Sequence, residues 1–223
     1  MTLAELMARH REYTSDKVGP HYLLSSDLLR QYLNEAEREA VIRARLIHES
    51  ADPDICEIDV VAGTSIHPLH AALYELDHVS FVPADETLRY PVRLVSQEWL
   101  DARRPDWRDD TGRPEFAIQG DKTLRLIPRP DAPGVIHLEG YRTPKAPMAA
   151  DTDEPEINPI HHVHLVEWSQ FLFYSTQDSE MYDPARAASA ADAFEARFGR
   201  APNADLRRQS REDVPHAVQA FMP

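Results

Sequence analysis

The spacing of apolar residues changes period twice along these 223 residues, and this change limits the fold more than any other feature. Leu29, Leu33 and Ala36 follow the three-to-four-residue spacing of a helix with one buried face. Cys56 and Ile58 begin an alternating pattern, which is typical of a strand with one face in a core. Helical spacing returns after residue 157. We therefore expect an α+β protein with helices at both ends and strands between them.

Helix-start signals define the first section. Thr2 and Glu5 match a capping box, so a helix is predicted over residues 3–13. Ser25, Ser26 and Asp27 provide the cap and first-turn charge of a longer helix, and Asp52-Pro53 ends the helical section. Residues 1–53 are thus predicted to be the N-terminal helices of a bundle. The polar face of the long helix is expected to meet water or an interface, through Arg30, Glu37, Arg38 and Arg45.

Residues 54–145 are predicted to form a small antiparallel β module. Gly120-Asp121-Lys122 has the chemistry of a tight hairpin turn, and Ser96 is positioned to cap a short helix. Trp99 and Trp107 are expected to cover an edge of the sheet. The predicted strands are residues 56–60, 73–82, 88–95, 115–119, 123–127 and 135–142.

Residues 146–199 are predicted to be a linker followed by a C-terminal helical hairpin. Asn158-Pro159 and Asp183-Pro184 each place a capping residue before a proline at the first helical position. The expected fold is a helical bundle formed by the N- and C-terminal helices, with the inserted β module and an extended C-terminal tail at 200–223. The tail lacks a helical stripe, so any order in it is expected to come from a partner.

The late helices carry more apolar surface than one buried face needs. This surplus has two interpretations, a core helix or a helix that also meets a neighbouring subunit, and we favour both together. The candidate subunit-interface residues are Trp168, Phe171, Leu172, Phe173, Tyr174, Phe194 and Phe198.

Charge and composition exclude several functions. With 24 basic and 38 acidic residues, the formal net charge is -14, which opposes attraction to nucleic acid but suits the wall of a channel through which DNA passes. No apolar run is long enough to cross a bilayer, so no membrane partner is expected. The single cysteine, Cys56, is expected to be a buried structural thiol.

The sequence contains no phosphate-binding glycine loop and no serine nucleophile elbow, so we predict no cofactor and no enzyme activity. His161, His162 and His164 are the most metal-like cluster, but such a site usually needs a ligand from another element. A small metal-dependent hydrolase using these histidines is the alternative from a different class. We predict a packed or surface histidine cluster, without a bound metal.

Two stretches resemble the head–tail adaptor (connector) proteins of tailed bacteriophages and prophages. The first comprises residues 105–107, 112–114, 123–131 and 141–144; the second runs from Ile160-His161-His162 to Glu167-Trp168 and on to Phe194–Gly199. The segment 32–36 adds to the likeness. The resemblance implies a ring, usually of twelve subunits, beneath the portal protein of the capsid.

Such a ring extends the DNA channel and docks tail or nozzle proteins, so the expected location is the head–tail interface of the virion, after assembly in the host bacterial cytoplasm. A tail-completion or stopper protein is a second structural alternative. The resemblance also suggests that the tail binds the portal. The candidate residues are Arg207, Arg208, Arg211, Val214 and Phe221.

Overall fold

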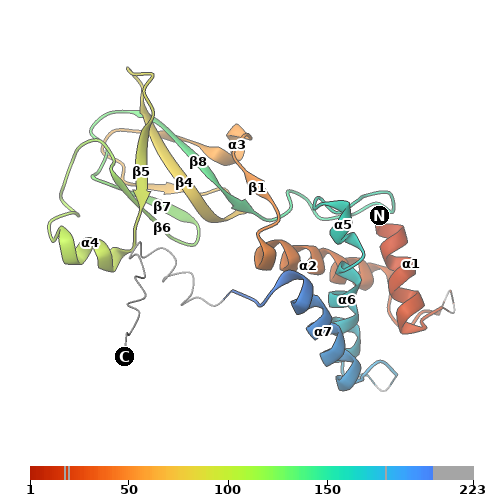
Figure 1. Cartoon of the computed structure of the whole chain (residues 1–223). Helices are drawn as coiled ribbons and strands as arrows, with labels where there is room; N and C mark the ends of the chain where they lie inside the picture. Colours follow the sequence, from red (N-terminus) through yellow and green to blue (C-terminus); the bar gives the residue numbers. More distant parts are fainter. Residues whose placement is uncertain (18, 20, 179, 203–223) are drawn as a thin grey trace, which may run out of the picture. The chain divides into compact units, whose positions relative to one another are not determined.

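The computed structural model describes residues 1–17, 19, 21–178 and 180–202, shown in Figure 1. They divide into two compact units. The helical unit comprises Met1–His48 and Tyr141–Ala201, and the β unit contains Glu49–Gly140. The five tail residues predicted to bind a portal lie outside the described residues.

The helical unit contains five helices: α1 (Leu3–Thr14), α2 (Ser26–Ala44), α5 (Pro159–His162), α6 (Leu165–Ser175) and α7 (Pro184–Phe198). The predicted capping box is confirmed, because the Thr2 hydroxyl accepts from the Glu5 N–H while the Glu5 carboxylate accepts from the Thr2 N–H. Asp183 caps α7 through the N–H groups of Ala185 and Arg186. These caps fix the helix starts that the sequence signals predict.

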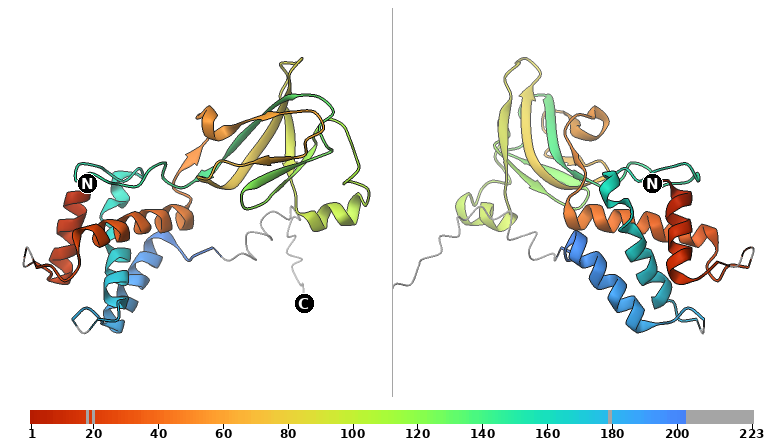
Figure 2. Two further views of the ribbon diagram at one scale, coloured as in Figure 1. Left: turned by 180° about the vertical axis from the view of Figure 1, so that it is seen from behind. Right: turned by 45° about the vertical axis from the view of Figure 1, so that its right-hand side comes forward.

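Helix α6 is the centre of this unit, since it packs against α7, α2 and α1. Helices α6 and α7 lie side by side in both views of Figure 2. The predicted stripe of α2 is buried, and Leu29, Leu33 and Ala36 are all fully enclosed. Leu165 and Val166 of α6 are equally enclosed, so the unit has a core of its own.

The helix expected after Asn158-Pro159 is broken into two. Helix α5 ends at His162, and α6 begins at Leu165. Between them the N–H of His164 donates to the His161 carbonyl, and the N–H of Glu167 donates to the His164 carbonyl. These three-residue hydrogen bonds tighten the chain into 3₁₀-type turns, which interrupt the α-helical ladder.

The β unit contains the strands β2 (Glu57–Val60), β3 (Ile66–Pro68), β4 (Leu73–Pro83), β5 (Tyr90–Leu94), β6 (Phe116–Gln119), β7 (Thr123–Ile127) and β8 (Gly134–Arg142, which ends in the helical unit). It also contains the short helices α3 (Pro53–Cys56) and α4 (Gln97–Arg103). With β1 (His48–Glu49), the strands form one eight-stranded sheet in the order β1-β8-β4-β5-β6-β7-β3, and β2 also pairs with β8.

The predicted fold class, a helical bundle with an inserted small antiparallel β module and an extended tail, is wrong. The strands form a mixed eight-stranded sheet curved into a half-barrel, and the helices are few beside it. Strand β5 pairs with β6 in parallel, with Arg93 opposite Phe116. The connection through α4 permits this pairing, because parallel neighbours need a crossover. Alternation identifies strands but not their pairing partners, so the sequence pattern did not reveal that the strands join in one large mixed sheet.

The half-barrel has a buried inner face and a partly covered outer face. The inner core includes Leu76, Phe81 and Leu138. A second cluster, with Leu100, Trp107 and Ile127 buried and Trp99 packed against it, covers the outer side of β6 and β7. Both tryptophans pack against the sheet as predicted, but they lie over β6 and β7 and not at the edge strand, which is β3. On β8 the side chains alternate strictly between buried and half-buried, so its outer face meets solvent.

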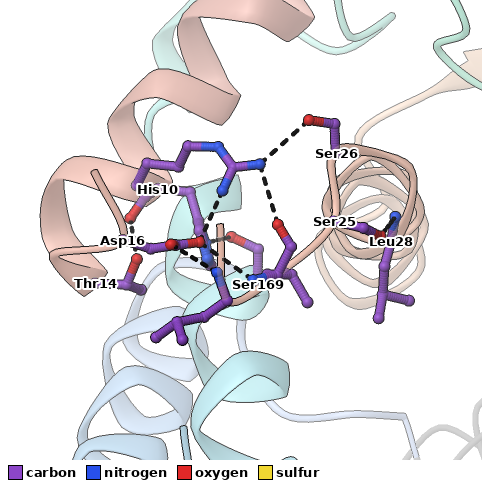
Figure 3. A network of polar contacts seen from close by, with 10 residues as sticks. His10, Thr14, Asp16, Ser25, Ser26, Leu28 and Ser169 are labelled. Atoms are coloured by element: carbon purple, nitrogen blue, oxygen red, sulfur yellow. Dashed lines mark hydrogen bonds and ion pairs between the residues drawn. The ribbon is translucent and has the colours of Figure 1, made fainter. Parts of the chain in front are cut away.

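A buried polar network joins α1 to the segment that leads into α2 (Figure 3). Arg11 donates through Nη1 to Asp16 Oδ2 at 2.7 Å and through Nη2 to the Leu24 carbonyl at 3.2 Å. Asp16 also accepts the backbone N–H groups of Leu23 and Leu24 at 2.9 and 3.2 Å. The ion pair is nearly excluded from water, with side chains 10% and 3% exposed. Such a pair is stable only because hydrogen bonds satisfy both charges.

Within the part of the chain that the structure describes, no helix combines the length and the apolar character needed to cross a membrane.

Candidate assembly surface

The aromatic residues of α6 and α7 form a continuous stack, here called the aromatic cluster: Trp168, Phe171, Phe194 and Phe198. The ring of Trp168 lies 4.8 Å from Phe171 and 5.0 Å from Phe194, between centroids. Phe194 lies 4.7 Å from Phe198. All three contacts are tilted, a geometry that aromatic pairs prefer to a face-to-face sandwich. The cluster holds α6 and α7 together.

Arg43 of α2 lies against the same cluster. Its guanidinium carbon lies 4.6 Å from the Trp168 ring centroid and 5.2 Å from that of Phe194. Glu39 holds Arg43 in place, since its carboxylate accepts from Nε at 2.9 Å. The Trp168 indole N–H donates to Glu35 at 3.2 Å. Trp168 of α6 and Arg43 of α2 are thus fixed together against Phe194 of α7.

The seven candidate interface residues fall into two groups. Phe173, Tyr174, Phe194 and Phe198 are buried within the helical unit, between 0% and 7% exposed. Trp168, Phe171 and Leu172 are partly exposed. The buried residues build the support of the surface, and the partly exposed ones form the part that another polypeptide can reach. Their role as subunit-interface residues stays a prediction.

The three histidines near the start of α6 have separate partners. His161 packs against Phe198 at 5.7 Å between ring centroids. His162 is buried, with Nε2 directed at the Ile157 carbonyl at 2.9 Å and Nδ1 at the Met1 amino group at 2.8 Å. His164 lies 3.0 Å from Glu167. Both ring nitrogens of His162 are therefore occupied, so this residue is not available as a metal ligand. No group of three or more His, Cys, Asp or Glu suited to a metal occurs within residues 1–17, 19, 21–178 and 180–202.

A buried histidine also links α1 to α6. His10 Nδ1 lies 2.8 Å from the Ser169 hydroxyl, which donates to the Val166 carbonyl. Ser169 therefore accepts from Nδ1–H, and the buried Nε2 has no hydrogen-bond partner among the described residues. Burial, helped by the neighbouring charge of Arg11, lowers the pKa of His10 to about 4. The ring stays neutral because a proton added to the enclosed Nε2 would have no acceptor for its hydrogen bond.

We expect His10 to make the protein acid-sensitive. Its pKa rises from about 4 in the folded chain to 6.5 in the unfolded one, so the unfolded chain binds more protons between these values. The free energy of unfolding should therefore fall as pH decreases from 6.5 to 4, by about 3 kcal/mol from this residue. The measurement is urea unfolding at several pH values for the wild type and His10→Gln. The difference in the free energy of unfolding between the wild type and His10→Gln should shrink on acidification. A difference that stays constant with pH would contradict the low pKa of His10.

The segment before α5 is held by two polar residues of α2. Asn34 pairs with the backbone of Met148 in both directions, donating to its carbonyl at 3.0 Å and accepting from its N–H at 2.7 Å. Glu37 accepts from the Glu156 N–H at 2.6 Å. Glu156 in turn binds Arg142, and this hydrogen bond lowers the pKa of Glu156. The predicted linker is thereby tied to α2.

The expectation that Glu37 faces water or an interface is wrong. Its residue is 2% exposed, and burial raises the pKa of its carboxyl to about 7 despite the two backbone N–H groups that it faces. Helical periodicity alone predicts that every polar residue opposite the apolar stripe is exposed to solvent. The spacing of Asn34 and Glu37 could have indicated a shared polar contact with another segment, because residues three apart share a helix face.

The helical unit presents a partly exposed tryptophan beside an arginine, a combination that is enriched at the centres of protein interfaces. The chain belongs to the SU10 adaptor protein family, whose model matches residues 1–219. It is therefore a phage adaptor protein, as the sequence resemblance predicted, and a component of the phage particle. A comparison with curated proteins found no match.

Proposed function

We propose that this chain is a head–tail adaptor subunit that forms a ring, of about twelve copies by the resemblance, beneath the portal protein. The ring extends the DNA channel and docks tail or nozzle proteins at the head–tail interface. Membership of an adaptor family supports this role. The residues beyond 202, with Arg207, Arg208 and Phe221 among them, are the proposed portal-binding tail.

The observation that carries the proposal is the partly exposed edge of the aromatic cluster. Tryptophan and arginine dominate the energetic centres of protein interfaces, because each combines a large apolar surface with a directed polar group. Trp168 meets this description and is partly exposed, whereas the Arg43 side chain is only 9% exposed and packs against the tryptophan ring. Glu35 and Glu39 already immobilise the two side chains. A partner that covers Trp168 therefore loses little side-chain entropy on binding.

The net charge of -14 supports the channel role. DNA moving through a ring must not adhere to its wall, and like charge between wall and phosphates prevents adhesion.

Electron microscopy of the purified chain mixed with its portal protein tests the function. The expected result is a ring of this chain bound to one end of the portal. A chain that binds tail proteins and ignores the portal would be a stopper instead. Monomers with affinity for neither would contradict the proposal.

We expect Trp168→Ala to weaken subunit association by about thirtyfold or more, as for an interface centre worth 2 kcal/mol. The measurement is the dissociation constant of assembly on portal rings, by native mass spectrometry. Tyr182→Ala is the matched control, since this aromatic is 54% exposed and lies outside the cluster. Thermal melting of each variant separates lost folding from lost binding, and a folded Trp168→Ala that assembles normally would remove this surface from the interface.

A further inference from the structure

The β unit carries a small cleft lined by three arginines. Trp107, Arg108, Arg125 and Arg129 line it, with Ser65 at its side, and its volume is about 30 Å³. We call it the arginine cleft. A space of this size admits one small polar group, such as a carboxylate, but not a nucleobase or a folded peptide.

The arginines stand on a fixed platform. Trp107 is 3% exposed, and its indole N–H donates to Asp101 at 2.9 Å. The guanidinium carbons of Arg108 and Arg125 lie 4.3 and 5.4 Å from the centroid of this ring. Guanidinium groups held over an aromatic face are pre-organised, so less conformational entropy is lost when they bind an anion.

The charge of the cleft is only partly balanced. Arg108 forms an ion pair with Asp101 at 2.7 Å. Arg125 and Arg129 have no carboxylate partner within the described residues, and the hydrogen bond of Arg129 goes to the Thr111 hydroxyl at 3.5 Å. Beside them lies an exposed apolar residue, Ile66, which is directly opposite Arg125 in the β3–β7 register and 49% exposed. Unbalanced charge next to apolar surface is typical of a protein-binding patch.

The outer face of β2 and β8 has the complementary character. Glu57 lies opposite His137 and contacts it at 3.3 Å, so Asp59, two residues further along β2, shares that face. Glu139 follows His137 on the same face of β8. Asp59 and Glu139 have no cationic partner within the described parts of the chain. Val61, which is 65% exposed, directly follows β2 and provides apolar surface here too.

The two patches are on different strands of the sheet, with β7 near one end of the strand order and β2 and β8 near the other. Two different complementary patches on one subunit produce a head-to-tail contact, and repeated head-to-tail contacts form a ring when the rotation between neighbouring copies closes. We propose that the arginine cleft of each copy receives a carboxylate from the β2–β8 face of the next copy. This inference rests on the proposed ring and assigns one of its interfaces to the β unit.

Duplex DNA is the rival occupant, and the observations favour a second copy. Asp106 and Asp109 are exposed in the loop that carries Arg108, and Asp110 is close by. Their charges repel a phosphate backbone, which presents a continuous row of anions, while a single carboxylate side chain can avoid them. The overall charge of -14 acts in the same direction.

Charge reversal tests the contact. Arg125→Glu/Arg129→Glu reverses the cleft, and Asp59→Lys/Glu139→Lys reverses the opposite face. Each double variant alone should raise the dissociation constant of self-association at least about tenfold. An equimolar mixture of the two should associate again, because each contact then joins opposite charges. Arg9→Glu/Arg197→Glu, two exposed arginines of the helical unit, is the control with the same charge change as the cleft variant.

Sedimentation velocity at about 0.05 M and 0.5 M salt gives the readout, since exposed ion pairs weaken as the screening length falls. A wild type that stays monomeric at low salt overturns the inference, and so do variants that associate normally or a mixture that fails to recover. Salt-sensitive binding of the wild type to duplex DNA, lost in the cleft variant while self-association is unchanged, identifies DNA as the occupant instead. Portal binding is measured separately. A chain that binds the portal but ignores these reversals keeps its proposed function and loses only this interface.

Discussion

Arg11→Met is expected to lower the free energy of unfolding by about 3–5 kcal/mol, one of the two largest effects of a single substitution that we predict. The methionine keeps the length of the side chain but removes the charge that faces Asp16. The carboxylate, 3% exposed, then remains in the interior without a counter-ion. It cannot move to water without releasing the N–H groups of Leu23 and Leu24. Chemical unfolding followed by circular dichroism gives the free energy.

Arg200→Met is the matched control for Arg11. Arg200 also forms an ion pair, with Glu195 at 2.8 Å, but its side chain is 88% exposed. An exposed pair gains little because water solvates both charges well, so this variant should unfold like the wild type. Equal loss in the two variants would show that burial does not determine the contribution of Arg11.

Phe194→Ala should destabilise the helical unit by about 3–5 kcal/mol, through lost burial and the cavity that remains. The Phe194 residue is fully enclosed, and its ring contacts Trp168, Phe198 and Arg43, so three neighbours lose a packing partner at once. Because these residues lie on three helices, collapse around the cavity is restricted. The midpoint of urea unfolding should fall with little change in its denaturant dependence.

Phe194→Leu serves as the graded comparison, because it fills most of the cavity and should recover more than half of the loss. The solvent-exposed Tyr182→Ala should change the free energy by less than about 0.5 kcal/mol. If Phe194→Ala were as mild as Tyr182→Ala, the aromatic cluster would not be the support of the proposed assembly surface.

The local structure follows closely from local signals. Thr2 with Glu5 predicted the start of α1, and Asp183-Pro184 predicted the start of α7, because a cap needs only residues within one turn. The strand predicted at residues 123–127 has those bounds in the structure. The short strands β1 and β3 were missed, since two or three residues are too few to show a period.

Partners distant in the chain could not be predicted in the same way. The parallel pairing of β5 with β6 depends on how α4 packs, and the enclosure of Glu37 depends on a segment more than a hundred residues away. The aromatic cluster was recognised as an apolar surplus. Its division into buried Phe194 and partly exposed Trp168 required the positions of α2 and α7.

By itself the sequence determined the capped helix starts and the longer strands, which family the chain resembles, and that its charge is strongly acidic. The tertiary structure alone decided that the strands form one mixed half-barrel, that His162 and Glu37 are enclosed, and that Arg125 and Arg129 share a cleft over Trp107. The physical reason is the distance along the chain over which each interaction acts. Caps, turns and periodicity act within a few residues, whereas burial and electrostatic surroundings are set by whichever distant segments pack against a side chain.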